Sequence, residues 1–308
     1  MIEYYYSTNK NPHMQAQSKP KVGSWIHVVE PNEKELQKLS DDFGLEQDLL
    51  ADAMDIYETP RVEQEGSDAY VFARYCFPQG VDIATEPILI VYTKEYIFTI
   101  LRKKTTILDK LISGVESVAT TQKTKTFLQI LAAINISYDR NLYKVNKQLL
   151  SIRSKLSKYD IRNEYFIEFI DIEENLNEYI SALQPQAVMY RNLLNGRFLP
   201  LYEDDKDLVE DLSLSTNELI DLIKSRLKTI SNIRDAYATV MANTLNATFR
   251  RLTSISIFLM IPAITAALYG MNLNLPLARN PNAFWIILLI VMILTSVCIW
   301  LFRKLKWL

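Results

Sequence analysis

The side chains of this 308-residue chain that are best suited to guide a cation recur along one face of a C-terminal helical pattern. They follow one another at steps of three, four, seven or eight residues, which keeps them on one side of an α-helix: Asp235, Ala242, Asn246, Phe249, Leu252, Met260, Ala263 and Ala267. Rings of carboxylates attract cations, and hydrophobic constrictions gate by dewetting, so this stripe is suited to line an ion path. Small residues also favour helix packing in lipid, and that interpretation stays open.

Other kinds of chemistry find no support in the sequence. The two cysteines, Cys76 and Cys298, are too far apart to indicate a metal knuckle or a redox pair. The two histidines, His13 and His27, lack the HExxH spacing of a zinc hydrolase. The seven glycines form neither GxGxxG nor a phosphate-binding loop. Because no nucleophile and base are paired either, we do not expect an enzyme.

Two uncharged apolar runs near the C-terminus determine the class of protein. Residues 252–269 form a run of 18, and residues 283–302 form a run of 20. About 20 apolar residues are needed to cross the hydrocarbon core as a helix, so we expect both runs to span a membrane. The alternative is a buried hairpin in a soluble bundle, but soluble helices of this length normally show a polar face.

Basic residues set the expected orientation of the two spans. Five of the six basic residues after position 249 lie at the outer ends of the two runs, and Arg279 lies in the loop between them. The positive-inside rule then puts both termini in the cytoplasm and residues 270–282 outside. Trp285 and Trp307 lie near the two ends of the second run, where indole prefers the interface. We therefore expect a cell-membrane protein that spans the lipid bilayer twice.

Charge is divided unevenly along the chain. It has 34 basic and 36 acidic residues, a net charge of −2, but the last 59 residues contain six basic residues and no acidic one. The first 249 residues therefore carry 28 basic and 36 acidic side chains. Since nucleic-acid binding needs clustered Lys and Arg, we expect no nucleic-acid partner. The polar residues 1–17 are not expected to form a secretory signal.

The part before the spans is expected to contain an α/β domain followed by a helical stalk. Content of β-branched and aromatic residues predicts strands at 25–29, 69–77, 87–92 and 96–101, and helices follow Pro31 up to Phe43 and at about 46–55. Apolar residues then recur at helical spacing over 123–158 and 163–194. The sequence thus divides into a cytoplasmic α/β domain (1–122), a cytoplasmic helical stalk (123–249) and a transmembrane hairpin with a basic tail (250–308).

A third long helix is expected to join the stalk to the membrane. From about Asp204 there is neither Gly nor Pro until Pro262, and proline is tolerated inside a membrane helix. The pattern therefore continues to Tyr269, which would make one helix roughly 100 Å long. A mechanical link is the natural use of such a rod, and a coiled-coil stalk that merely precedes the anchor is the alternative.

A short motif follows the first span. The tetrapeptide Tyr269-Gly270-Met271-Asn272, together with the tail Lys306-Trp307-Leu308, resembles the CorA family of magnesium and cobalt transporters. The resemblance covers the whole architecture and implies an α+β fold, with an N-terminal cytoplasmic α/β domain, long stalk helices and two C-terminal transmembrane helices. For Gly270-Met271-Asn272 by themselves, an ordinary helix C-cap is the alternative.

The resemblance implies a homopentamer. Two spans per chain cannot enclose a pore, so transport requires a ring of identical chains. In such a pentamer the first span would line the pore, the second would face lipid, and Gly270, Met271 and Asn272 would form the selectivity ring outside. Mg2+ sheds water reluctantly. A ring of neutral amide and carbonyl oxygens suits a hydrated ion, because it accepts hydrogen bonds without stripping the water.

The resemblance also implies roles for four residues of the stripe. Met260 and Leu252 match the hydrophobic gate of the family, Asn246 matches a polar pore ring, and Asp235 matches an acidic ring further along the stalk.

Two further carboxylates match a regulatory site of the family. Asp52 and Asp211 correspond to acids of neighbouring subunits in that family, and cytoplasmic Mg2+ bridges these acids and holds the pore shut. Without the resemblance, each would be interpreted as an ordinary surface acid. Loss of the bound ions would leave like charges that repel and loosen the ring.

The outer loop departs from the family pattern. Residues 273–282 contain Arg279 and no acid, whereas family loops often carry a Glu that gathers cations. The main prediction is a passive channel for Mg2+ driven by the membrane potential and gated by cytoplasmic Mg2+. Transport of Co2+, Ni2+ or Zn2+ remains an alternative, and so does a non-conducting, membrane-anchored oligomeric scaffold.

Overall fold

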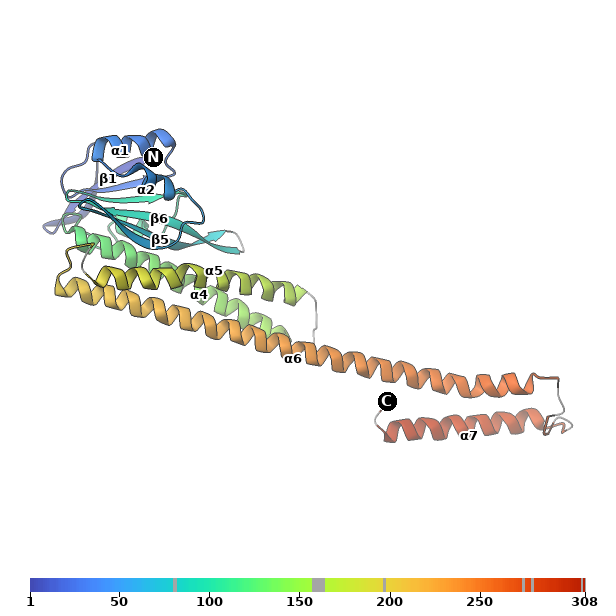
Figure 1. Cartoon of the computed structure of the whole chain (residues 1–308). Helices are drawn as coiled ribbons and strands as arrows, with labels where there is room; N and C mark the ends of the chain where they lie inside the picture. The colour runs from blue at the N-terminus through green and yellow to red at the C-terminus, as the bar shows by residue number, and fades with distance from the viewer. Residues whose placement is uncertain are drawn as a thin grey trace. The chain divides into compact units, whose positions relative to one another are not determined.

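The structure, a computed structural model, describes residues 1–79, 82–156, 164–195, 198–272, 275–277, 280–305 and 307. The chain forms two compact units, Met1–Ser231 and Asn232–Leu308, and helix α6 (Glu203–Tyr269) runs from the first into the second (Figure 1). Arg279 of the outer loop and Lys306 and Leu308 of the tail lie outside the described residues. The division into three parts made from the sequence stays a prediction.

The first unit is built on a seven-stranded mixed sheet with the order β2-β1-β3-β7-β6-β5-β4. Strands β3 and β7 pair in parallel, and the other five neighbouring pairs are antiparallel. The strands are β1 (Ile2–Thr8), β2 (Asn11–Gln17), β3 (Trp25–Val29), β4 (Arg61–Glu65), β5 (Asp68–Gln79), β6 (Asp82–Tyr92) and β7 (Ile97–Leu101).

Two short helices cover one face of this sheet. Helix α1 (Glu33–Phe43) starts with a capping box between Asn32 and Glu35, which satisfies two backbone donors. Gly44 ends it in the left-handed conformation at φ 70°, which glycine adopts readily at the end of a helix. Helix α2 (Gln47–Asp52) follows, and apolar side chains of both helices pack on the sheet in one buried cluster.

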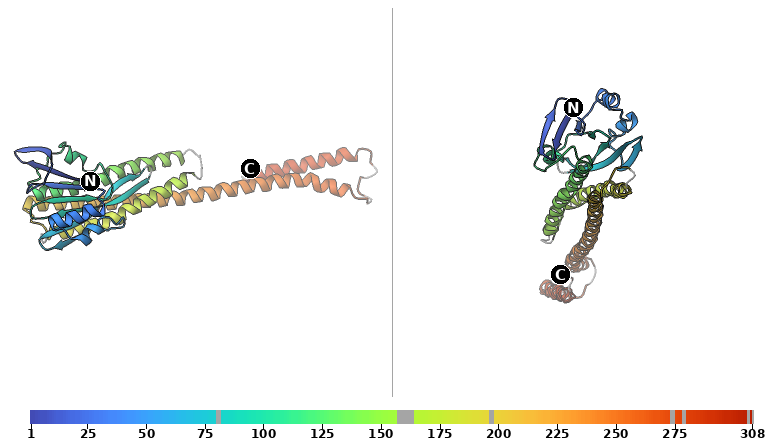
Figure 2. Two further views of the ribbon diagram at one scale, coloured as in Figure 1. Left: turned by 90° about the horizontal axis from the view of Figure 1, so that it is seen from above. Right: turned by 90° about the vertical axis from the view of Figure 1, so that its left-hand side faces the viewer.

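Three long helices lie on the opposite side of the sheet (Figures 1 and 2). They are α4 (Lys123–Leu156), α5 (Glu164–Leu194) and the first part of α6. The Asn135 amide on α4 donates to the Thr216 hydroxyl on α6 at 2.9 Å and accepts from Gln186 and Tyr190 on α5 at 3.1 and 3.0 Å. Because these groups are buried and mutually satisfied, they fix how the three helices pack.

Most elements predicted from the sequence are present, and the α+β fold class is confirmed. The strands expected at 25–29, 69–77, 87–92 and 96–101 correspond to β3, β5, β6 and β7, and the long helices begin and end within two residues of the prediction wherever they are described. The helix expected over 46–55 is too long, because tight turn hydrogen bonds from Met54 to Ala51 and from Asp55 to Asp52 replace the helical pattern. Strands β1, β2 and β4 and the one-turn α3 (Asp109–Ile112) were not predicted.

The second unit holds the two apolar helices. Helix α7 (Ala283–Lys304) packs against the last part of α6, where the Phe258 and Phe302 rings lie 5.4 Å apart. The most apolar windows of α6 and α7 are only 6% and 0% buried. A soluble core helix would be mostly buried, so this low burial argues against the soluble-hairpin alternative, and both helices have the length and composition of membrane spans.

Buried His27 makes the stability of the first unit depend on pH. Burial on β3 lowers its pKa from 6.5 to about 4. The unfolded chain therefore binds the proton first, and stability present at neutral pH is lost as the pH falls through the unfolded pKa. Between pH 7 and pH 5 this residue should remove about 2 kcal/mol from the free energy of unfolding.

The measurement is chemical unfolding of the full-length protein in detergent at both pH values. His27→Gln should reduce the loss of stability on acidification, whereas His13→Gln should keep it, because His13 is exposed on β2. An equal loss in the wild type and in His27→Gln would contradict the assignment.

Candidate functional site

The predicted stripe on α6 is exposed along its whole length in a single chain. All eight of its residues, from Asp235 to Ala267, are exposed. Among its large apolar members, Phe249 is 57% exposed, Leu252 60% and Met260 54%. No hydrogen bond or ion pair occupies the Asp235 carboxylate or the Asn246 amide in the described residues. The stripe therefore presents a face that this chain leaves uncovered.

A different face of α6 carries the contact with α7. Ser254 is fully buried, and Phe258, Ile261 and Thr265 are partly buried, at steps of three and four that keep them on one side of the helix. Counting round the helix puts this side roughly opposite the stripe. Since α7 occupies one side of α6, the stripe is available to something other than α7.

The motif at the end of α6 is not a left-handed glycine cap. Helix α6 ends at Tyr269, and the Gly270 amide still donates to the Ala266 carbonyl at 2.9 Å. Gly270 is not among the described glycines with a positive φ, so the backbone there does not require glycine. A Cβ at Gly270 would meet only the Ala266 and Ala267 carbonyls among the described atoms, at 3.3 and 3.6 Å. The helix-cap alternative thus leaves the choice of glycine unexplained.

The other two motif residues are open to their surroundings. Met271 is 48% exposed, and Asn272 is exposed. The Asn272 side chain makes no hydrogen bond within the described residues, so its oxygen and its amide hydrogens remain available to a ligand.

Asp52 at the end of α2 is already paired. Its Oδ2 accepts from Arg61 Nη2 at 2.8 Å, and the same guanidinium contacts the carboxylates of Glu58 and Glu63. The Asp52 side chain is 46% exposed. A cation at Asp52 would therefore compete with Arg61 for the carboxylate.

Asp211 lies apart from Asp52 in the first unit. It is exposed on α6 and lines a groove against α4, whose wall contains Asp139 together with apolar side chains such as Leu128 and Leu208. No hydrogen bond or ion pair joins Asp52 to Asp211, and no three His, Cys, Asp or Glu side chains of the described residues gather as a metal site. One chain by itself therefore does not complete the regulatory pair.

Comparison with known proteins identifies the family to which this architecture belongs. The model of the family described as CorA-like Mg2+ transporter protein matches residues 20–304. The chain belongs to the CorA family. It is 27% identical over 295 residues to the cobalt/magnesium transport protein CorA of Methanocaldococcus jannaschii, covering 92% of this chain and 90% of that protein.

Solved structures share the fold from end to end. The complete structure of the CorA magnesium transporter from Methanocaldococcus jannaschii matches with a TM-score of 0.88 at 20% identity, covering 100% of this chain and 99% of that one. Full-length CmaX matches with a TM-score of 0.74 at 17% identity, covering 99% and 97%. As a CorA-family member, the chain is a divalent-cation transporter of the membrane with two spans, and not an enzyme.

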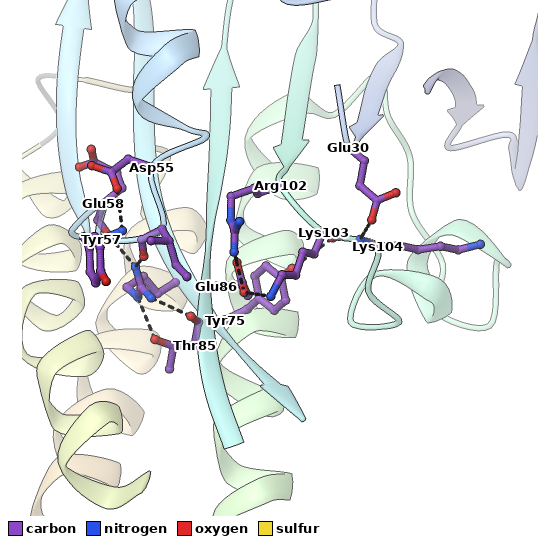
Figure 3. A network of polar contacts seen from close by, with 12 residues as sticks. Glu30, Asp55, Tyr57, Glu58, Tyr75, Thr85, Glu86, Arg102, Lys103 and Lys104 are labelled. Atoms are coloured by element: carbon purple, nitrogen blue, oxygen red, sulfur yellow. Dashed lines mark hydrogen bonds and ion pairs between the residues drawn. The ribbon is translucent and has the colours of Figure 1, made fainter. Parts of the chain in front are cut away.

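A polar network that the sequence did not reveal holds the segment after α2 of this CorA-family protein. Arg74 on β5 donates to the Ile56 and Glu58 carbonyls, both at 2.8 Å, and to the hydroxyl and carbonyl of Thr85 at 2.9 and 2.7 Å. Thr85 in turn donates to Glu178 on α5. Asp55, Glu58 and Thr85 of this region are labelled in Figure 3. The network connects α5 to the segment between α2 and β4, whose Glu58 contacts Arg61, the partner of Asp52.

A second ion cluster lies beside it. Figure 3 shows Arg102 and Lys103 reaching toward Glu86, which is only 1% exposed. Arg102 binds both carboxylate oxygens at 2.8 and 3.0 Å, and Lys103 approaches to 2.5 Å. The buried carboxylate is thus compensated by two cations. Arg74 and Glu86 interrupt otherwise apolar strands, and this is the signal by which sequence reasoning could have found them.

Replacing Arg74 tests whether this network holds the segment. Arg74→Met keeps the length of the side chain but leaves the Ile56, Glu58 and Thr85 carbonyls without their donor. The free energy of unfolding should fall by about 1–3 kcal/mol. Thermal unfolding of the full-length protein measures it, with Arg153→Met on the exposed side of α4 as the matched control. Equal melting temperatures for the two variants would show that the network carries no stability.

Proposed function

We propose that this CorA-family chain forms a homopentameric channel for passive influx of hydrated Mg2+, driven by the membrane potential and gated by cytoplasmic Mg2+. The observation that carries the proposal is the exposed stripe on α6, which α7 leaves uncovered and which runs up to Gly270-Met271-Asn272. Exposed polar groups are costly in hydrocarbon. In a ring of identical chains, the stripe faces the common axis and α7 faces lipid.

The neutral motif suits an ion that keeps its water. Asn272 offers an amide oxygen that no hydrogen bond within the described residues occupies, and the absence of a Cβ at Gly270 opens the backbone to close approach from outside the chain. Mg2+ dehydrates reluctantly and is usually bound through retained waters. A ring of five such motifs would bind the hydration shell rather than the bare ion.

The remaining stripe residues would act in order along the path. Met260 and Leu252 form hydrophobic constrictions that close by dewetting. Asn246 adds a polar ring, and Asp235 adds a ring of carboxylates that attracts cations. With both termini in the cytoplasm, an inside-negative potential draws Mg2+ inward by about 2.3 kcal/mol per charge for each 100 mV.

Gating would come from Mg2+ bound between subunits. Asp52 of one subunit and Asp211 of its neighbour supply the carboxylate oxygens that Mg2+ prefers. The Arg61 guanidinium at 2.8 Å from Asp52 competes with the ion, so it weakens the site. When internal Mg2+ falls, Asp52 returns to Arg61, the bridge between subunits is lost, and the ring loosens.

Two alternatives keep the same fold. The Methanocaldococcus jannaschii relative is named a cobalt/magnesium transport protein, which makes Co2+ the first competing substrate, followed by Ni2+ and Zn2+. A non-conducting scaffold is the other alternative, and it would leave the unpaired Asn272 and the polar end of the stripe without a use.

Asn272→Ala tests the selectivity ring. It removes the amide oxygen that would accept hydrogen bonds from the hydrated ion, so Mg2+ flux into proteoliposomes should fall at least about tenfold while assembly stays intact. Asn282→Ala is the matched control, since Asn282 precedes α7 and its side chain makes no capping bond. Normal flux in Asn272→Ala would remove this residue from the filter.

The gate is tested by a pair of variants with opposite effects. Asp52→Ala combined with Asp211→Ala should leave flux less inhibited by internal Mg2+, because the bridging ligands are gone. Arg61→Ala frees Asp52 from its competitor and should lower the internal Mg2+ concentration that gives half-inhibition. Flux titrated against internal Mg2+ measures both. If neither variant moves the inhibition curve, the gating acids lie elsewhere in the chain.

A further inference from the structure

An apolar groove of about 390 Å³ lies in the first unit between α4 and the first part of α6. Of the apolar side chains that line it, Leu128 and Leu212 are buried, whereas Ile136 and Leu208 are 49% and 43% exposed. Large apolar side chains left open together favour a partner that covers them. Asp211, which the proposed gate places between subunits, lines the same groove.

Two acids give this groove a negative charge. Asp139 on α4 and Asp211 on α6 are exposed, and neither carboxylate has a hydrogen bond or an ion pair within the described residues. No basic side chain is among the described residues that line the groove. A partner for this surface must therefore bring apolar side chains, together with a cation if it carries acids of its own.

Tyr57 offers apolar surface of this kind on another part of the chain. Its side chain is 84% exposed on the turn that follows α2, and that of the adjacent Ile56 is 40% exposed. Tyrosine is enriched among the side chains that dominate the binding energy of interfaces. The turn thus presents two neighbouring apolar side chains that this chain leaves uncovered.

Hydrogen bonds fix the turn that carries Tyr57. The Tyr57 amide donates to the Asp55 carboxylate at 2.9 Å, and Arg74 donates to the Ile56 and Glu58 carbonyls on either side of it, both at 2.8 Å. Figure 3 includes Asp55, Tyr57 and Glu58 in this network. Because the backbone is already held in place, little conformational entropy is lost when such a side chain docks.

A second copy of the chain is the partner that fits the groove. A ring of identical chains needs contacts in which one patch of each chain meets a different patch of the next. Tyr143 and Tyr202 are also largely exposed, but Tyr143 lies on α4 and Tyr202 directly precedes α6, so both belong to the helices of the groove itself. Tyr57 lies on a separate segment and follows Asp52 by five residues, which span at most about 18 Å. An ion between Asp52 of one subunit and Asp211 of the next would therefore bring Tyr57 within reach of the groove.

We propose that Tyr57 and Ile56 of one subunit dock into the groove between α4 and α6 of the next subunit, and that this contact lowers the Mg2+ concentration at which the gate closes. The inference rests on the proposed function, because it takes from there the ring of subunits and the ion between Asp52 and Asp211. Burial of an aromatic and a branched side chain draws the two surfaces together. The acids on both surfaces oppose this until Mg2+ binds between them, so apolar docking and ion binding favour the same closed state.

Cross-linking between subunits of the full-length protein in detergent tests the contact without any flux. Tyr57→Cys is combined with Leu208→Cys in a Cys298→Ala background, since Cys76 is buried. A thiol cross-linker with a short spacer should join neighbouring subunits in the presence of Mg2+, and the product should be lost on chelation. Tyr57→Cys with Leu150→Cys is the matched control, because Leu150 is exposed on α4 but lies outside the groove.

In protein shown to be pentameric, three results would overturn the contact. They are absence of the cross-link with Mg2+, a cross-link that chelation leaves unchanged, and equal cross-linking through Leu150. Each can be observed whether or not the protein conducts Mg2+.

Flux measurements test the effect of the contact on the gate. Tyr57→Ser and Leu208→Ser should each raise the internal Mg2+ concentration that gives half-inhibition at least about fivefold, because each removes buried apolar surface from the closed state. The double variant should shift it no further than the larger single effect, since both changes remove one contact. Tyr143→Ser, an exposed tyrosine on α4 outside the groove, should leave it unchanged.

The same titration separates this inference from the proposed function. Inhibition that is equal in the wild type and in Tyr57→Ser, while Asp52→Ala combined with Asp211→Ala relieves it, would overturn the docking contact and keep the gate. A wild type that internal Mg2+ does not inhibit would instead contradict the proposed gate, and with it the regulatory part of the inference.

Discussion

The cost of placing polar groups and ions in hydrocarbon is the constraint on which the rest of this structure depends. The last part of α6 and the whole of α7 satisfy their own backbone as helices and present mainly apolar side chains. Polar side chains flank the apolar part of the stripe on α6. Asn246 lies before this part, and Asn272 lies just beyond its other end. A single hairpin has no way to shelter such a face. Assembly around a common axis, as proposed above, would shelter this face and would form the path that a divalent-cation transporter needs.

The first unit holds acidic side chains in two different ways. Its sheet is buried between two helical layers, and Glu86 is neutralised by Arg102 and Lys103 within it. Asp52 instead lies near the surface, and its partner Arg61 is shared with Glu58 and Glu63, so under the proposed gating mechanism it would exchange Arg61 for the ion. Shared ion pairs near the surface contribute little stability. A carboxylate held in this way can change partners at small cost, as a regulatory ligand must.

Strong local patterns made much of the fold predictable from the sequence. The helix after Pro31 was expected to reach Phe43, where α1 ends, and the absence of Gly and Pro between Asp204 and Pro262 predicted a continuous α6 up to Tyr269. The edge strand β2 escaped prediction because residues such as His13 and Gln15 make it polar and exposed, and β1, which pairs with it, was missed as well. The roles of the motif residues and of the stripe were predicted from spacing and resemblance, and they stay predictions. Arg61 and Arg74 were not, because their importance lies in partners that only folding brings together.

Mg2+ entry into proteoliposomes that contain the purified protein and an internal magnesium dye tests the central claim most directly. The measurement is made with and without an inside-negative potential, on protein shown to be pentameric. The account predicts entry that rises with the potential. Entry of Co2+, Ni2+ or Zn2+ but not of Mg2+ would support the pore and would show that it carries a different ion. Absence of entry for every divalent cation tested would contradict the account and would favour the non-conducting scaffold.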